Sequence, residues 1–183
     1  RSTLTASAIE QRYYLVHESD KTNALTRLFE IEPIKSALIF ARTRAETASL
    51  ANELVVRGIP AEAIHGDLDQ NARERVLGRF RANQLKVLVA TDVAARGLDI
   101  DDISHVFNFH LPDDAEVYIH RIGRTGRAGK SGVAITLLAP RERRRLREVE
   151  ALPKHPVTQM TLPTVGDIHR YSENQVIETM KVW

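Results

Sequence analysis

Residues 37–65 read ALIFARTRAETASLANELVVRGIPAEAIH, and this stretch decides the fold. Four apolar residues open it and a second run, 61–65, closes it, as two strands of one sheet would. Between them, segment 44–57 carries an apolar stripe at helical spacing, formed by Ala48, Ala51, Leu54 and Val55. Gly58 and Pro60 then end the helix. The stretch therefore predicts a strand, a helix and a second strand in one βαβ unit.

The same alternation continues along the chain. Strands are predicted over Arg12–His17, Ala37–Phe40, Ala61–His65, Lys86–Ala90, His105–Phe109 and Val133–Leu138. Helices are predicted over Thr22–Glu32, Arg44–Arg57, Asn71–Ala82, Asp114–Arg121 and Pro140–Leu152. Several strands are nearly continuous apolar runs, which is typical of strands buried on both faces of a parallel sheet. We therefore expect a three-layer α/β/α domain with a mainly parallel central sheet, whose ligand face lies at the carboxyl ends of the strands.

The length of 183 residues favours one domain with a short appendage. Three prolines fall within 153–163, so we expect the domain to span 1–152 and an extension to span 153–183. In the extension, residues 157–162 would form a short extended piece and residues 164–183 a helix.

The residue content excludes several classes of protein. With no cysteine, the chain has no disulfide framework, no thiolate nucleophile and no cysteine-based zinc site. It has no apolar run long enough for a transmembrane helix, and its start lacks the apolar core of a signal peptide. We expect a cytoplasmic protein without membrane contact. Because the sequence begins without methionine, we also expect it to be part of a longer protein.

The basic residues are concentrated although the net charge is only +2. Between residues 120 and 147 a single acid, Glu142, accompanies nine basic residues: Arg121, Arg124, Arg127, Lys130, Arg141, Arg143, Arg144, Arg145 and Arg147. Such an excess favours a polyanionic partner, which means phosphate groups or a nucleic-acid backbone. For 141–147 a solvated basic helix face is the alternative.

Residues 120–127, HRIGRTGR, are the most informative segment. Guanidinium groups are permanently charged forks that suit phosphate oxygens, and glycines let the backbone approach a partner closely. If the turn is roughly helical, His120, Arg124 and Arg127 face one way. The alternative is an ordinary basic surface turn.

Two other segments only resemble phosphate sites. Gly129-Lys130-Ser131 would end a P-loop only with glycine at 124, where the chain has Arg124. Asp92 ends an apolar strand as a magnesium ligand would, but without a P-loop we interpret it as a helix N-cap or loop organiser. The seven histidines show no metal-site spacing, and no metal site is predicted. The chain thus has arginines that reach phosphate but no cradle for it, so they would complete a nucleotide pocket on another domain.

Four segments resemble, in order and spacing, the second RecA-like lobe of DEAD-box RNA helicases. Leu38–Arg44 resembles motif IV, and Gln70–Arg73, preceded by His65-Gly66-Asp67, resembles the QxxR motif. Ala90–Ile100 is similar to motif V and His120–Arg127 to motif VI. The resemblance covers about residues 9–152, and the overall texture is most similar to bacterial cold-shock or heat-resistant members.

This resemblance implies an ATP-dependent RNA helicase whose ATP and Mg²⁺ are held mainly by an N-terminal RecA-like lobe. Arg124 and Arg127 would meet the γ-phosphate, with Arg127 as the arginine finger, and Asp99 would bind the ribose. His120 and Arg121 would link the two lobes. RNA phosphates would be contacted, without sequence specificity, by Thr43, Gly66, Arg73, Thr91 and Arg96.

Some relatives carry a dimerisation region after this lobe, so a homodimer formed through the C-terminal region is also expected. Two alternatives remain. One is a non-catalytic RNA-binding or protein-docking module that retains the fold. The other is a DNA motor of the same superfamily.

Overall fold

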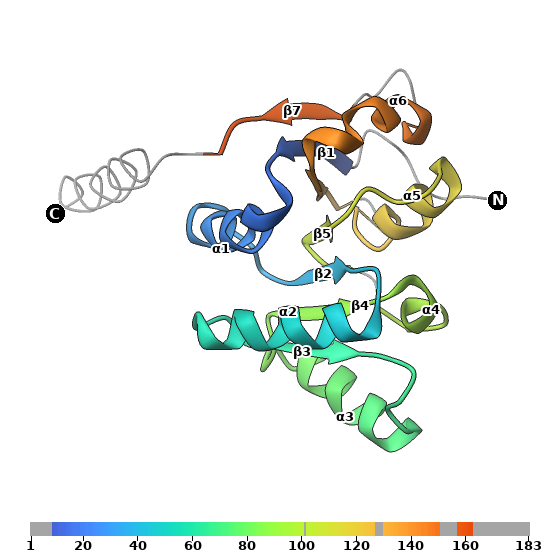
Figure 1. Ribbon diagram of the computed structural model, residues 1–183. Coiled ribbons are helices and arrows are strands. Elements are labelled where there is room, and N and C mark those ends of the chain that lie inside the picture. The colour runs from blue at the N-terminus through green and yellow to red at the C-terminus, as the bar shows by residue number, and fades with distance from the viewer. Residues whose placement is uncertain (1–8, 101, 127–129, 151–156, 163–183) are drawn as a thin grey trace, which may run out of the picture.

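The computed structural model describes residues 9–100, 102–126, 130–150 and 157–162. They form one seven-stranded sheet in the order β3-β4-β2-β5-β6-β1-β7, in which every pairing is parallel. In Figure 1 the sheet runs from β3 near the bottom to β7 at the top. The strands are β1 Ile9–Leu15, β2 Ala37–Phe40, β3 Ala61–Ile64, β4 Val87–Ala90, β5 His105–Asn108, β6 Gly132–Leu138 and β7 Thr158–Met160. The predicted parallel sheet is confirmed.

Helices cover both faces of this sheet. The α-helices are α1 Lys21–Ile31, α2 Arg44–Val56, α3 Gln70–Arg81, α4 Asp92–Ala95, α5 Ala115–Ile122 and α6 Leu146–Val149, and the 3₁₀ helices are η2 Glu18–Asp20 and η3 Pro140–Arg145. On one face, α1 and α2 pack over Ile39 and Phe107. On the other, α3 and α4 pack over Leu38 and Val106, and α5 and α6 over Ala134. The predicted three-layer α/β/α architecture is therefore confirmed.

The buried face of α2 differs from the predicted stripe. Its buried residues are Thr47, Leu50, Ala51 and Leu54, whereas Ala48 and Val55 are exposed. This set has the spacing i, i+3, i+4, i+7 of an amphipathic helix, but a polar residue fills its first position. Thr47 is tolerated there because its hydroxyl donates a hydrogen bond to the carbonyl of Arg44 at 2.6 Å.

The segment predicted as a helix over 140–152 is η3 followed by the short α6. In the first turn the buried carboxylate of Glu142 accepts hydrogen bonds from the backbone N–H groups of Ala139 (2.8 Å) and Leu111 (3.3 Å), and residues 151 and 152 lie outside the described residues.

The sheet continues past residue 152, because β7 pairs with β1 and Val157 is buried beside it. The division of the chain at 152 remains a prediction, and the helix predicted over 164–183 lies outside the described residues. Among the described helices, none is both long and apolar enough to span a membrane.

Candidate functional site

The predicted ligand face lies where β3, β4, β2 and β5 end. Each of the following helices starts with a capping side chain that accepts a hydrogen bond from a backbone N–H two or three residues further into the helix. Thr43 accepts from Glu46 at 3.0 Å, Asp69 from Ala72 at 2.7 Å, Thr91 from Ala94 at 3.2 Å and Asp114 from Val117 at 2.9 Å. These caps fix the loops at one edge of the sheet, as the parallel order requires.

One of these helices, α4, was not predicted from the sequence. It has only four residues, too few to show an apolar period, and the capping residue Thr91 is its one sequence signal. Thr91 thus occupies the N-cap position, which was one of the two roles predicted for Asp92, the other being a loop organiser. Asp92 instead uses its carboxylate to hold an arginine of α5.

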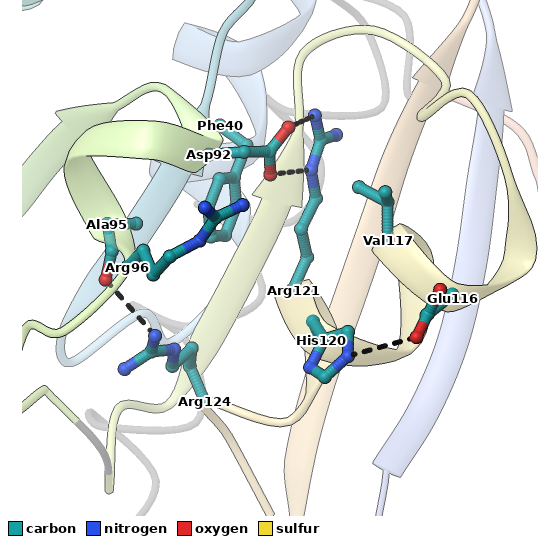
Figure 2. Close-up of a pocket in the computed structure, with 9 residues that line it drawn as sticks. All are labelled: Phe40, Asp92, Ala95, Arg96, Glu116, Val117, His120, Arg121 and Arg124. Carbon is teal, nitrogen blue, oxygen red and sulfur yellow. Dashed lines mark hydrogen bonds and ion pairs between the residues drawn. The ribbon is translucent and has the colours of Figure 1, made fainter.

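A hollow of about 520 Å³ opens between α4 and α5 (Figure 2). It is lined by Phe40, Asp92, Ala95, Arg96, Glu116, Val117, His120, Arg121 and Arg124. Motifs that lie about 30 residues apart in the sequence therefore share one surface. Of the residues predicted to face nucleotide or the other lobe, His120, Arg121 and Arg124 are brought together here.

Arg121 is held inside the domain. Its Nε and Nη2 each donate to one oxygen of Asp92 at 2.7 Å, and Nη1 donates to Asn108 Oδ1 at 2.9 Å. The guanidinium lies 5.0 Å from the centre of the Phe40 ring, and only 8% of the side chain is exposed. This geometry favours a role for Arg121 in positioning Asp92 and Asn108 over the predicted link to another lobe. Its guanidinium group already donates to Asp92 on one side and to Asn108 on the other.

Arg124 clamps the loop that follows α4. Its Nη1 donates to the carbonyls of Leu98 (2.8 Å) and Ile100 (3.3 Å), and its Nη2 donates to Ala95 (3.1 Å). Leu98 and Ile100 flank Asp99, so Arg124 fixes the backbone on both sides of the predicted ribose ligand. These bonds use three of the five guanidinium N–H groups, and the other two have no partner among the described residues.

Two exposed side chains of the hollow, His120 and Arg96, are available to a partner. His120 is 77% exposed, and its contact with Glu116 is long, at 4.0 Å. Arg96 is exposed, with no hydrogen bond or ion pair from its side chain to the described residues. Asp99 is also exposed, and within the same residues its carboxylate has no partner. Arg127 lies outside the described residues.

The residues predicted for RNA contact form two groups on the same edge. Arg73 donates to the carbonyl of Ala94 at 3.5 Å, which brings it beside α4 with Thr91 and Arg96. Thr43 and Gly66 lie on the loops after β2 and β3, and an ion pair between Arg44 and Asp67 joins these loops. Gly66 is exposed and has open space around its Cα, so the backbone there is accessible.

A buried polar network beneath the β2–α2 loop was missed by the sequence analysis. Lys21 is fully buried, and its ammonium donates to Phe109 O at 2.8 Å and to Glu142 Oε1 at 3.3 Å. His110 lies 3.2 Å from the Lys21 Nζ and 2.6 Å from Glu46 Oε2. The network ties α1, α2 and η3 to the loop that carries Thr43. A lysine in an ordinary amphipathic helix gives no sequence signal of such a role.

Charge within this network lowers the pKa of both acids. Burial by itself raises the pKa of Glu142, but the hydrogen bond from Ala139 and the Lys21 ammonium outweigh it and hold the pKa below its ordinary value. Burial likewise opposes ionisation of Glu46, and His110 and the Arg42 N–H outweigh it, so its pKa is lowered too. Both carboxylates are therefore charged at neutral pH.

The positioning role of Arg121 can be tested by Arg121→Lys in the 183-residue chain. A lysine cannot donate to both oxygens of Asp92 and to Asn108 in the same plane, so we expect about 1.5–3 kcal/mol of stability to be lost. Urea unfolding measures this loss. The control is Arg96→Lys in the same hollow, where we expect a change within about 0.5 kcal/mol. Equal effects of the two changes would contradict the positioning role.

The sequence matches a family model described as the helicase conserved C-terminal domain over residues 20–129. Among curated proteins, the DEAD-box ATP-dependent RNA helicase CshA of Geobacillus kaustophilus (strain HTA426) is 46% identical over 177 residues, which are 97% of this chain and 38% of that protein. CshA of Bacillus subtilis (strain 168) is 45% identical over 178 residues, 97% of this chain and 36% of that protein. The chain thus spans little more than a third of the length of these relatives.

Solved structures agree with the fold. The Escherichia coli DEAD-box protein SrmB, crystallised with regulator of ribonuclease activity A, matches with a TM-score of 0.79 and 37% identity over 87% of this chain and 93% of that one. The C-terminal domain of the DEAD-box protein Dbp5 matches with a TM-score of 0.81 and 32% identity over 93% of this chain and 99% of that one.

Proposed function

The chain belongs to the DEAD-box ATP-dependent RNA helicases as their C-terminal, RecA-like helicase domain, and we propose that it works as one half of an ATP-driven machine that separates or remodels short RNA duplexes. An N-terminal RecA-like lobe of the same protein would supply the other half. One observation carries this proposal. Arg96, Arg124 and the exposed imidazole of His120 line an open hollow, and Arg124 holds the loop that carries the exposed Asp99, as expected for one wall of a composite site.

The chain's own residues fit part of an ATP site. The exposed Asp99 carboxylate has acceptor oxygens for ribose hydroxyls, and Arg124 both fixes its loop and keeps donors free for phosphate. The described residues contain no cluster of His, Asp and Glu side chains that would hold a metal ion. Mg²⁺ with the triphosphate would therefore be held mainly by the N-terminal lobe, where it would neutralise charge on the phosphates. Arg127 would act as the arginine finger.

RNA would lie along the other part of the edge. Thr43, Gly66, Arg73, Thr91 and Arg96 would contact phosphates, which positions a strand without reading its sequence. If ATP and RNA each bind across the same two lobes, one closing motion completes both sites and couples their binding. In that state His120 is the side chain best placed to meet the opposite lobe, because Arg121 is occupied within its own domain. A cytoplasmic location and a homodimer formed through the C-terminal region belong to the same proposal.

The isolated 183-residue chain is expected to show no ATP turnover above background, and it should bind single-stranded RNA only weakly. The reason is that the phosphate cradle and half of the RNA contacts lie on another lobe. Phosphate release with and without RNA measures the first property, and fluorescence anisotropy of labelled RNA the second.

The full-length protein is the positive control for both measurements. In it, RNA-stimulated hydrolysis and ATP-dependent separation of a short duplex are expected. Turnover by the isolated chain would contradict the composite site. RNA binding by the full-length protein without hydrolysis would indicate a non-catalytic module, and equal stimulation by DNA would indicate a DNA motor.

A further inference from the structure

The segment 140–149 exposes its arginines while its first acid is hidden. Glu142 is only 3% exposed, and its oxygens accept from Ala139 N, Leu111 N and Lys21 Nζ. Arg42 also lies against it, with 3.4 Å between Nη2 and Oε2. The charge of Glu142 is thus neutralised by partners inside the domain, chiefly the Lys21 ammonium and two backbone N–H groups. It cannot offset the arginines that lie on either side of it at the surface.

Three of these exposed arginines recur at every third residue of the segment. In a 3₁₀ helix, side chains three residues apart eclipse each other and are separated by roughly 6 Å along the axis. Arg141 and Arg144 have this spacing in η3, and Arg147 follows three residues later in α6. We call these three the arginine row; Arg143 is exposed beside it.

Few acids oppose the arginine row. Within the described residues its one ion pair joins Arg141 to Glu18 at 3.6 Å, between side chains that are 67% and 40% exposed, so it contributes little. Glu148 is exposed nearby but pairs with none of the row. Arg145, by contrast, turns inward and donates to Pro112 O at 3.0 Å. The fold thus separates the one arginine that it uses structurally from those that it presents to solvent.

The arginine row is continuous with the loop predicted to contact RNA. η3 follows β6 and therefore starts at the carboxyl edge of the sheet, the edge where Thr43 follows β2. Arg42 bridges the two, because it precedes Thr43, is half-exposed and contacts Glu142 of η3. We call Arg42 together with the arginine row the basic strip; the acids that pair with it are the buried Glu142, against Arg42, and Glu18, against Arg141.

We propose that this strip is a second RNA-binding surface, which holds the phosphates of a single strand that extends beyond the contacts near Thr43. The inference rests on the proposed RNA-binding function. Guanidinium groups bind phosphate oxygens in pairs of hydrogen bonds, and a row of them follows a backbone without reading bases. This second surface would retain RNA that is longer than the stretch bound between the two lobes.

The test compares two double variants of the full-length protein that remove the same charge. Arg144→Gln with Arg147→Gln changes the arginine row. Lys35→Gln with Arg79→Gln changes two exposed cations at the opposite edge of the sheet, since Lys35 precedes β2 and Arg79 lies in the last turn of α3. Affinity is measured as a function of salt concentration for two single-stranded RNAs. The short one fills only the proposed contacts between the lobes, and the other is several times longer.

We expect the row variant to bind the long RNA more weakly, with a salt dependence reduced by about 1.4 in slope, because each single-strand phosphate contact contributes about 0.7. Binding of the short RNA, and all binding by the control variant, should match the wild type. An unchanged salt-dependence slope on the long RNA would show that the arginine row is a solvated helix face. That result would overturn this inference and leave the proposed function intact. Equal losses on both RNAs would overturn it as well. If the wild type bound neither RNA, the proposed function would fail first.

Discussion

Replacing Arg127 with alanine in the full-length protein is expected to reduce RNA-stimulated ATP hydrolysis by roughly 10³–10⁵-fold, the range that arginine fingers contribute in related nucleotidases. The family resemblance gives Arg127 this role. Arg127 itself lies outside the described residues, whereas Arg121 is buried against Asp92 and Arg124 is bonded to the loop around Asp99. Phosphate release under saturating RNA measures the effect. RNA affinity should remain near that of the wild type.

Two further variants make the assignment specific. Lys130→Ala removes an exposed cation three residues further along, whose ion pair with Asp102 is on the surface, so hydrolysis should not change. Arg124→Ala should mainly raise KM for ATP, because it releases the backbone on both sides of Asp99. If Arg127→Ala retained hydrolysis within tenfold of the wild type, Arg127 would not be the finger.

Most of the fold could be predicted because its strands are short, apolar and separated by helices with clear ends. β2 was predicted to the residue, and β3, β4 and β5 differ by one residue at one end. The errors have local causes. A polar residue, Thr47, lies on the buried face of α2, and α4 is too short to show a period. The 3₁₀ form of η3 was not predicted either, and its buried Glu142 bonds to partners in α1 and the loop after β5.

The candidate site was predictable as a set of residues but not as a set of roles. The motif around Arg121 and Arg124 indicates phosphate chemistry from its composition alone. The sequence cannot show that Arg121 spans the gap to Asp92, 29 residues away, because that bond depends on how α5 crosses the ends of β4 and β5. Lys21 and His110 were missed for the same reason. Their partners lie in η2, α1, α2 and η3, and nothing in the flanking residues indicates the contacts.

Lys21→Met in the 183-residue chain is expected to cost about 3–5 kcal/mol of stability, which is the usual penalty for leaving a buried charge without its partner. Methionine fills the same space, but Glu142 then keeps only the half-exposed Arg42 as a cation. Phe109 O would also lose its hydrogen bond from the lysine. Urea unfolding at neutral pH measures the loss. The control Arg42→Gln removes the exposed partner and should cost less than about 1 kcal/mol.

Acid titration separates the lost charge pair from a simple packing defect. In the folded wild type the pKa values of Glu142 and Glu46 lie below their ordinary value of 4.5, so their contribution is complete above pH 4.5 and is lost as the pH falls below it. Removing the Lys21 ammonium removes one of the interactions that lower the pKa of Glu142, so this pKa is expected to be higher in Lys21→Met than in the wild type. In acid titrations of Lys21→Met, the change in stability that comes from protonation of Glu142 should therefore begin at a higher pH than in the wild type. Adding Glu142→Gln should restore part of the stability at neutral pH, since no unpaired charge remains. A double variant no more stable than Lys21→Met would show that shape, and not charge, makes Lys21 necessary.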